Sequence, residues 1–172
     1  MKDSITIEKV QLSDPRTIEE RSIVTGKEQQ VIDVTITVRN QSVTEDYYLI
    51  SDLREVNYDP VSHTLFLGLI DESRNQVDLQ CLLVPSVITL MAGAVTNFGV
   101  VIPMILRRLK FPISIPPKEE AIDISLVEHV QCRIAFHDIP PLIKQPDSGK
   151  IEINYSLPWG QFVEATFDVG LP

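Results

Sequence analysis

Hydrophobic and polar residues alternate strictly along residues 31–39, VIDVTITVR. The even-numbered positions from 32 to 38 hold only Ile and Val, while the odd-numbered positions from 33 to 39 hold Asp, Thr and Arg. A period of two built from β-branched residues indicates a strand with one buried face and one face in water. This segment therefore predicts a strand in a sheet that covers a core.

The same pattern predicts further strands along the rest of the chain. They cover residues 4–12, 63–70, 77–84, 126–136, 150–157 and 161–169, and residues 46–60 add another with a break near Ser51–Asp52. Polar segments separate them, and the one at 71–76 predicts a hairpin. Only the segment SDPRTIEER has a helix start signal, with Asp14 as cap and Pro15 at the first helical position. We therefore expect at most one short helix, near residues 14–21.

About eight to ten short strands at this spacing favour an all-β fold. We expect a two-layer antiparallel β-sandwich of immunoglobulin-like type. The length of 172 residues suits one domain, which we place over residues 1–172.

Residues 87–106 contain no charged residue and could be read as a membrane-spanning helix, because twenty helical residues are about 30 Å long. Two glycines, a proline near the end and many β-branched residues favour strands instead. The flanking strands would also lack a second layer if a membrane span divided them. We expect a strand at 87–92, a turn over 92–97 and a strand at 98–102, and we consider a membrane span unfavourable.

Charge is distributed unevenly along the chain. The formal net charge is −9, which disfavours a nucleic-acid partner because phosphate binding needs a basic surface. No acidic residue occurs between Asp78 and Glu119, and this segment contains four basic residues. An apolar, mildly basic stripe on an acidic protein indicates either a contact surface or simply buried strands with basic borders. For the first interpretation, Arg107, Arg108 and Lys110 are the candidate interaction residues.

The two cysteines, Cys81 and Cys132, are placed within predicted apolar strands. A disulfide between two sheets would fit an immunoglobulin-like domain, but the tryptophan expected soon after the first cysteine is missing. No secretory signal follows Met1, so we favour two buried free thiols and a cytoplasmic location.

Catalytic and metal-binding motifs are sparse. His129 and His137 fall on one predicted strand about 26 Å apart, too far to bind one metal ion together. His137 and Asp138 could contribute to a metal-dependent hydrolase only if other loops converged on them; otherwise we expect His137 to be half exposed at a strand end. No nucleophile motif and no phosphate-binding glycine loop is present. We therefore assign no catalytic residue, no metal site and no cofactor, and a non-catalytic protein is favoured over an enzyme.

One aromatic loop is a candidate ligand site. The segment NYSLPWGQF brings Tyr155 and Trp159 together around a Pro–Gly turn. Such a platform could bind a sugar or another small ligand, or the tryptophan could instead close one end of the sandwich.

Our leading hypothesis is a non-catalytic module that self-associates or binds a protein partner through open sheet edges and the stripe. The alternatives are a small-ligand or carbohydrate-binding module that uses Tyr155 and Trp159, and a metal-dependent hydrolase.

Overall fold

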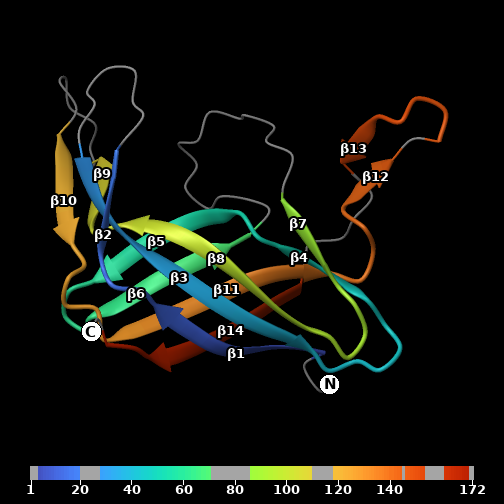
Figure 1. The fold of residues 1–172 in the computed structure, drawn as a ribbon, viewed down its shortest axis with the longest axis horizontal. Helices are drawn as coiled ribbons and strands as arrows, with labels where there is room; N and C mark the ends of the chain where they lie inside the picture. The colour runs from blue at the N-terminus through green and yellow to red at the C-terminus, as the bar shows by residue number, and fades with distance from the viewer. Residues whose placement is uncertain are drawn as a thin grey trace.

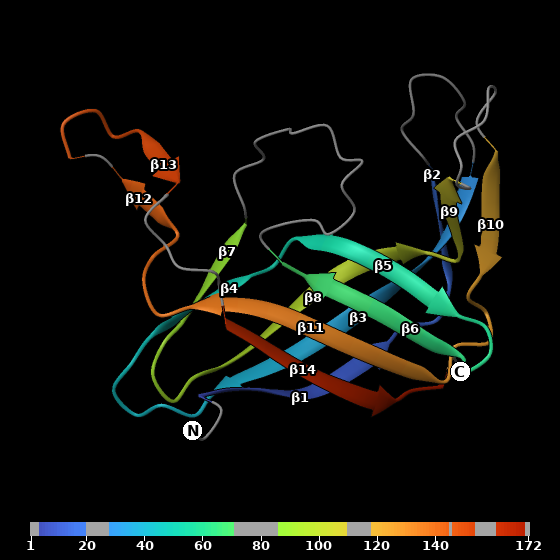
Figure 2. The same cartoon turned by 180° about the vertical axis from the view of Figure 1, so that it is seen from behind.

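The computed structural model describes residues 4–19, 28–70, 86–109, 118–144, 146–153 and 161–170 (Figure 1). These residues form fourteen strands and no helix. Two sheets pack face to face, and Figures 1 and 2 view this sandwich from its two sides. The predicted all-β sandwich is confirmed.

The first sheet, called sheet A, is built around the longest strand. It consists of β1 (Ile5–Leu12), β2 (Arg16–Glu19), β3 (Glu28–Asn40) and β8 (Val95–Pro103). β1 and β2 follow one another along one edge of β3, and β8 pairs with β3 along the other edge. All these pairs are antiparallel.

The second sheet, called sheet B, is built around β11. Its strands are β4 (Tyr47–Ile50), β5 (Leu53–Asp59), β6 (Thr64–Leu69), β7 (Val87–Leu90), β11 (His129–His137) and β14 (Gln161–Asp168). β14 pairs antiparallel with β11, whereas β6 pairs parallel with it, and β4 continues antiparallel beside its last residues. The parallel pair departs from the purely antiparallel sandwich that we expected, and this strand order does not establish an immunoglobulin-like arrangement.

Two short antiparallel ribbons extend from the sandwich. β9 (Ile105–Leu109) pairs with β10 (Glu119–Asp123), and β12 (Leu142–Lys144) pairs with β13 (Ile151–Ile153). Figures 1 and 2 show these ribbons at opposite ends of the molecule.

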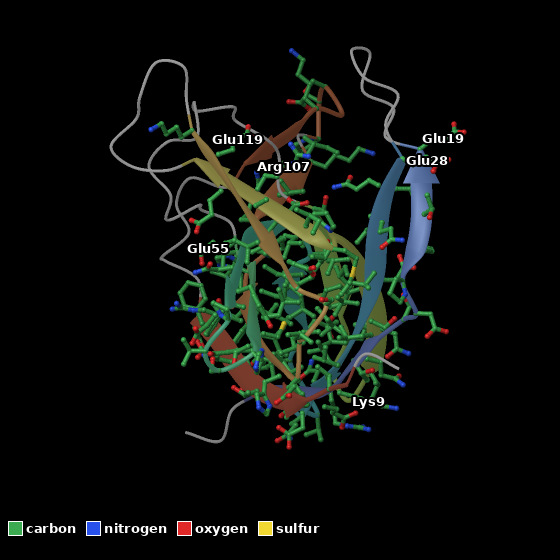
Figure 3. All side chains as sticks on the ribbon, turned by 90° about the vertical axis from the view of Figure 1, so that its left-hand side faces the viewer. Lys9, Glu19, Glu28, Glu55, Arg107 and Glu119 are labelled. Carbon is green, nitrogen blue, oxygen red and sulfur yellow. The ribbon has the colours of Figure 1, made fainter. Side chains whose placement is uncertain are left out.

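The core fills the space between the sheets, as the side view in Figure 3 shows. The alternation of residues 31–39 predicts its contribution correctly, because every even-numbered residue from 32 to 38 is fully buried. Sheet B contributes the even-numbered residues of β11 and the odd-numbered residues of β6 in the same way. These buried side chains are Val130, Cys132, Ile134 and Phe136 from β11 and Leu65, Leu67 and Leu69 from β6.

Several other predictions can be compared with the structure. The break near Ser51–Asp52 is confirmed, because β4 ends at Ile50 and β5 begins at Leu53. The short helix is wrong where residues 14–21 are described. Arg16–Glu19 is β2, which pairs antiparallel with β3, and this pairing overrides the local helix start signals. The strand at 77–84 and the hairpin at 71–76 lie outside the described residues.

Candidate functional site

The uncharged segment 87–106 forms strands in both sheets. β7 belongs to sheet B and β8 to sheet A, and a turn over Met91–Ala94 carries the chain between them. In this turn the Ala94 N–H donates to the Met91 carbonyl at 3.0 Å, and Gly93 adopts a φ of 71°, which only glycine adopts readily. Among the described residues, no helix is long and apolar enough to span a membrane. The strand interpretation is confirmed, but the turn is shorter and β8 begins earlier than we predicted.

The candidate basic residues follow directly after β8. Arg107 lies on β9 and is exposed, and its guanidinium is 3.6 Å from the carboxylate of Glu119 on β10 (Figure 3). The main chain of Arg108 pairs with Glu120 in the same ribbon, whereas Lys110 lies outside the described residues. Arg107 therefore has an acidic neighbour in its own chain, and a role of these basic residues in an interaction stays a prediction.

The structure describes the histidine candidates but not the aromatic ones. Tyr155 and Trp159 lie outside the described residues, and a ligand site there stays a prediction. His129 and His137 share β11 as predicted, but His137 is buried opposite Tyr48 rather than half exposed, because β4 extends sheet B beside it. No group of three or more potential metal ligands occurs within the part of the chain that the structure describes.

Cys132 is a buried free thiol on the core face of β11. Its burial raises the pKa of the thiol to about 12, because a thiolate would lose its hydration there. A thiol in this state is not a nucleophile at neutral pH. The free thiol predicted at Cys132 is confirmed, and Cys81 lies outside the described residues.

The hydrogen bonds of β8 alternate between its two sides. At the two ends of the ladder, the Met104 N–H donates to the Gln30 carbonyl and the Asn40 N–H donates to the Ala94 carbonyl, each at 2.9 Å. The register between β3 and β8 has no shift in between. Because bonded pairs alternate along an antiparallel ladder, the even-numbered residues of β8 bond to β3. The N–H and C=O groups of the odd-numbered residues therefore point to the opposite, open edge.

The open edge of β8 is exposed and uncharged. Its odd-numbered residues before Pro103 are Val95, Asn97, Gly99 and Val101, all of which are exposed. Val95 retains 43% of its surface and Val101 retains 47%. No residue of β8 is charged, and none pairs with a strand other than β3 among the described residues. The edge thus offers main-chain donors and acceptors with no charged side chain to keep another strand away.

The other edges of the two sheets are protected or short. β5 has three charged residues and a register shift between Leu53 and Glu55. β1 has a shift between Ile7 and Lys9, and it lies beside β14, which closes that side of the sandwich (Figures 1 and 2). β7 is uncharged but has only four residues. Charges, bulges and short length are the usual means by which edge strands avoid pairing with other chains, and β8 uses none of them.

A buried asparagine positions the start of β8. The side-chain amide of Asn40, at the end of β3, donates to the main-chain carbonyls of Glu45, Leu90 and Met91 at 2.7, 3.1 and 3.1 Å. Its carbonyl oxygen accepts a hydrogen bond from the Ser42 N–H at 2.9 Å. These bonds join the two crossings between the sheets, one from β3 to β4 and one from β7 to β8. β8 therefore starts from a cross-linked corner rather than from a loose loop.

A second polar surface lies on the outer side of sheet B. Glu55, Gly68, Arg133 and Glu164 form one row across β5, β6, β11 and β14. The Arg133 guanidinium carbon is 4.2 Å from the centre of the Phe162 ring, and Arg133 Nε is 3.9 Å from the Glu164 carboxylate. This arginine is therefore stacked on Phe162 and close to a carboxylate of its own chain, while its buried Nε has no hydrogen-bond partner among the described residues.

Sequence reasoning missed the first third of β8. The prediction treated Thr96 and Asn97 as turn residues because of their polarity, although the alternation of buried and exposed positions extends through them. The even-numbered series Thr96, Phe98, Val100 and Ile102 is the signal that could have located the whole strand.

The corner and the open edge together define the candidate site of this chain. Comparisons with protein-family models, with curated protein sequences and with solved structures find no match.

Proposed function

We propose that this chain is a non-catalytic interaction module that binds another polypeptide by strand addition at β8. In strand addition, an extended segment pairs with an exposed sheet edge, main-chain hydrogen bonds supply affinity, and alternate side chains supply specificity. The single observation that carries the proposal is the open edge of β8, nine residues long and without charge.

The reactive and charged side chains considered above support a binding role over catalysis. Cys132 is buried with a raised pKa, and the described residues hold no metal-ligand cluster. Arg107 and Arg133 each have an acidic partner in the chain. Within the described ranges, the outward main-chain groups of β8 pair with no other strand.

Position-specific photo-crosslinking in the cell of origin tests this function. A photoreactive amino acid replaces Val101, at the open edge, or Thr35, which is exposed on the same face of sheet A but lies on the central strand. We expect polypeptide adducts from position 101 that are absent from position 35. Asn97→Pro should abolish them, because it removes one outward N–H while leaving the bonds to β3 intact. Equal adducts at both positions, or none at position 101, would overturn the proposal.

A further inference from the structure

The exposed hydrophobic side chains around β8 are arranged symmetrically. Val95 and Val101 lie three residues to either side of Phe98, and Met91 and Ile105 lie seven residues to either side of it. All four side chains are exposed, and they are four of the ten large hydrophobic residues exposed in the described part of the chain. A strand with this symmetry presents the same pattern when it is read in the reverse direction.

We propose that the polypeptide that binds β8 is a second copy of this chain, paired antiparallel through β8 about a two-fold axis at Phe98. This proposal rests on the proposed function of β8 and names its partner. In a two-fold interface each surface must be complementary to itself. The symmetric pattern meets this condition, because Val95 lies opposite Val101 of the second copy and Val101 lies opposite Val95.

The main-chain hydrogen bonds fit this register. The odd-numbered residues of both copies face one another, so Asn97 lies opposite Gly99 of the second copy, and the joined edge forms about eight hydrogen bonds. Pro103, which has no N–H, lies just outside the paired segment. A register centred on Gly99 would instead place Val95 opposite Pro103 and lose bonds at both ends.

The charges next to β8 are compatible with two copies. On sheet A, Arg39 lies beside Val95 and Asp33 lies beside Val101. In the proposed register, Arg39 of one copy therefore shares a cross-strand row with Asp33 of the other. Both are already neutralised within their own chain, Arg39 by Glu8 and Asp33 by Arg16 at 2.7 Å. Each copy has a net charge of −9, so two copies repel one another. Higher ionic strength should screen this repulsion and favour the dimer.

Sedimentation equilibrium of the purified full chain tests the dimer. We expect wild type to reach twice the monomer mass of 19.4 kDa at high concentration. Val101→Lys and Asn97→Pro should each raise the dissociation constant by about tenfold or more, since every substitution acts twice in a symmetric dimer. Thr35→Lys adds the same charge on the same face of the central strand and should dimerise as wild type does. A wild type that stays monomeric up to about 1 mM would overturn the proposal, as would a Val101→Lys variant that dimerises normally.

Disulfide trapping tests the register without a disruptive substitution. In a Cys81→Ser background, mixed Val95→Cys and Val101→Cys chains should form a covalent dimer under mild oxidation. Neither variant should do so alone, because positions 95 of the two copies would be roughly 20 Å apart and a disulfide needs about 7 Å or less between Cα atoms. Cross-linking of Gly99→Cys with itself, in place of the mixed pair, would overturn the register.

The two proposals can fail separately. Photo-crosslinks from position 101 that contain only other proteins would leave strand addition standing and exclude the second copy. An absence of any position-specific adduct would remove both.

Discussion

The side-chain amide of Asn40 donates a hydrogen bond to the main-chain carbonyl of Leu90 at 3.1 Å and so joins the end of β3 in sheet A to the end of β7 in sheet B. Asn40 is only 1% exposed. A side-chain amide at this depth has lost its hydration, and its hydrogen bonds to the main chain compensate for that loss. The residue thus holds together the corner from which the proposed interaction strand begins.

Asn40→Ala should lower the free energy of unfolding by about 1–3 kcal/mol, because it removes the four hydrogen bonds that this buried side chain makes with the main chain. Urea denaturation followed by circular dichroism measures the change. Gln41→Ala is the matched control, since the neighbouring side chain is exposed and should contribute little. Similar midpoints for the two variants would show that the corner does not depend on the amide.

Two strand glycines should respond differently to the addition of one methyl group. A Cβ at Gly68 would lie 2.9 Å from the Cβ of Glu55 on the neighbouring strand, whereas at Gly99 the nearest atom is 3.7 Å away. We expect Gly68→Ala to destabilise the protein by about 1–3 kcal/mol, because the Glu55 Cβ cannot rotate away as the end of a side chain could.

Gly99→Ala should leave the unfolding free energy nearly unchanged, and the pair is best compared at protein concentrations low enough to keep the chain monomeric. Equal losses for both substitutions would contradict the close approach of β5 and β6 at Gly68.

Cys132 should resist alkylation in the folded protein. With its pKa raised to about 12, about one thiol in ten thousand is ionised at pH 8, and the side chain is fully buried. Iodoacetamide followed by peptide mass mapping should find Cys132 unmodified under native conditions and modified in urea. Rapid native labelling at this position would show that β11 opens readily.

The same burial gives stability a pH dependence in alkali. The folded protein keeps the thiol proton above its ordinary pKa of 9.0, so this contribution to stability is complete below pH 9. It should decline as the pH rises from 9 toward 12, because the unfolded chain loses the proton first. Cys132→Ala should remove this part of the slope in urea titrations at several pH values; an unchanged slope would argue against ionisation of Cys132 as its source.

Alternate amides of β8 should exchange with solvent at different rates. In the Val101→Lys variant, which we expect to remain monomeric, the even-numbered amides from 96 to 102 bond to β3. Nuclear magnetic resonance should find them protected relative to the odd-numbered amides from 95 to 101 by on the order of a hundredfold or more. In wild type at high concentration, the odd-numbered amides should become protected as well. Uniform exchange along β8 in the variant would contradict the alternating ladder.

The sequence by itself determined the fold class and the buried face of its clearest strands. Residues 31–39 could be assigned because a period of two with β-branched side chains has one physical solution at a sheet surface. The same local rule located the break at Ser51–Asp52 and assigned residues 87–106 to strands. It failed at Arg16–Glu19, where helix start signals are weaker than pairing with β3.

Only the tertiary structure decided which edges are open. A strand's alternation records which residues face the core, but it does not record which neighbour takes its hydrogen bonds, because main-chain groups are the same in every residue except proline. That β8 pairs with β3 and with no other described strand, and that Asn40 joins two crossings fifty residues apart, depends on contacts between distant segments. The candidate site is made of main-chain groups and small exposed side chains, and therefore no motif in the sequence marked it.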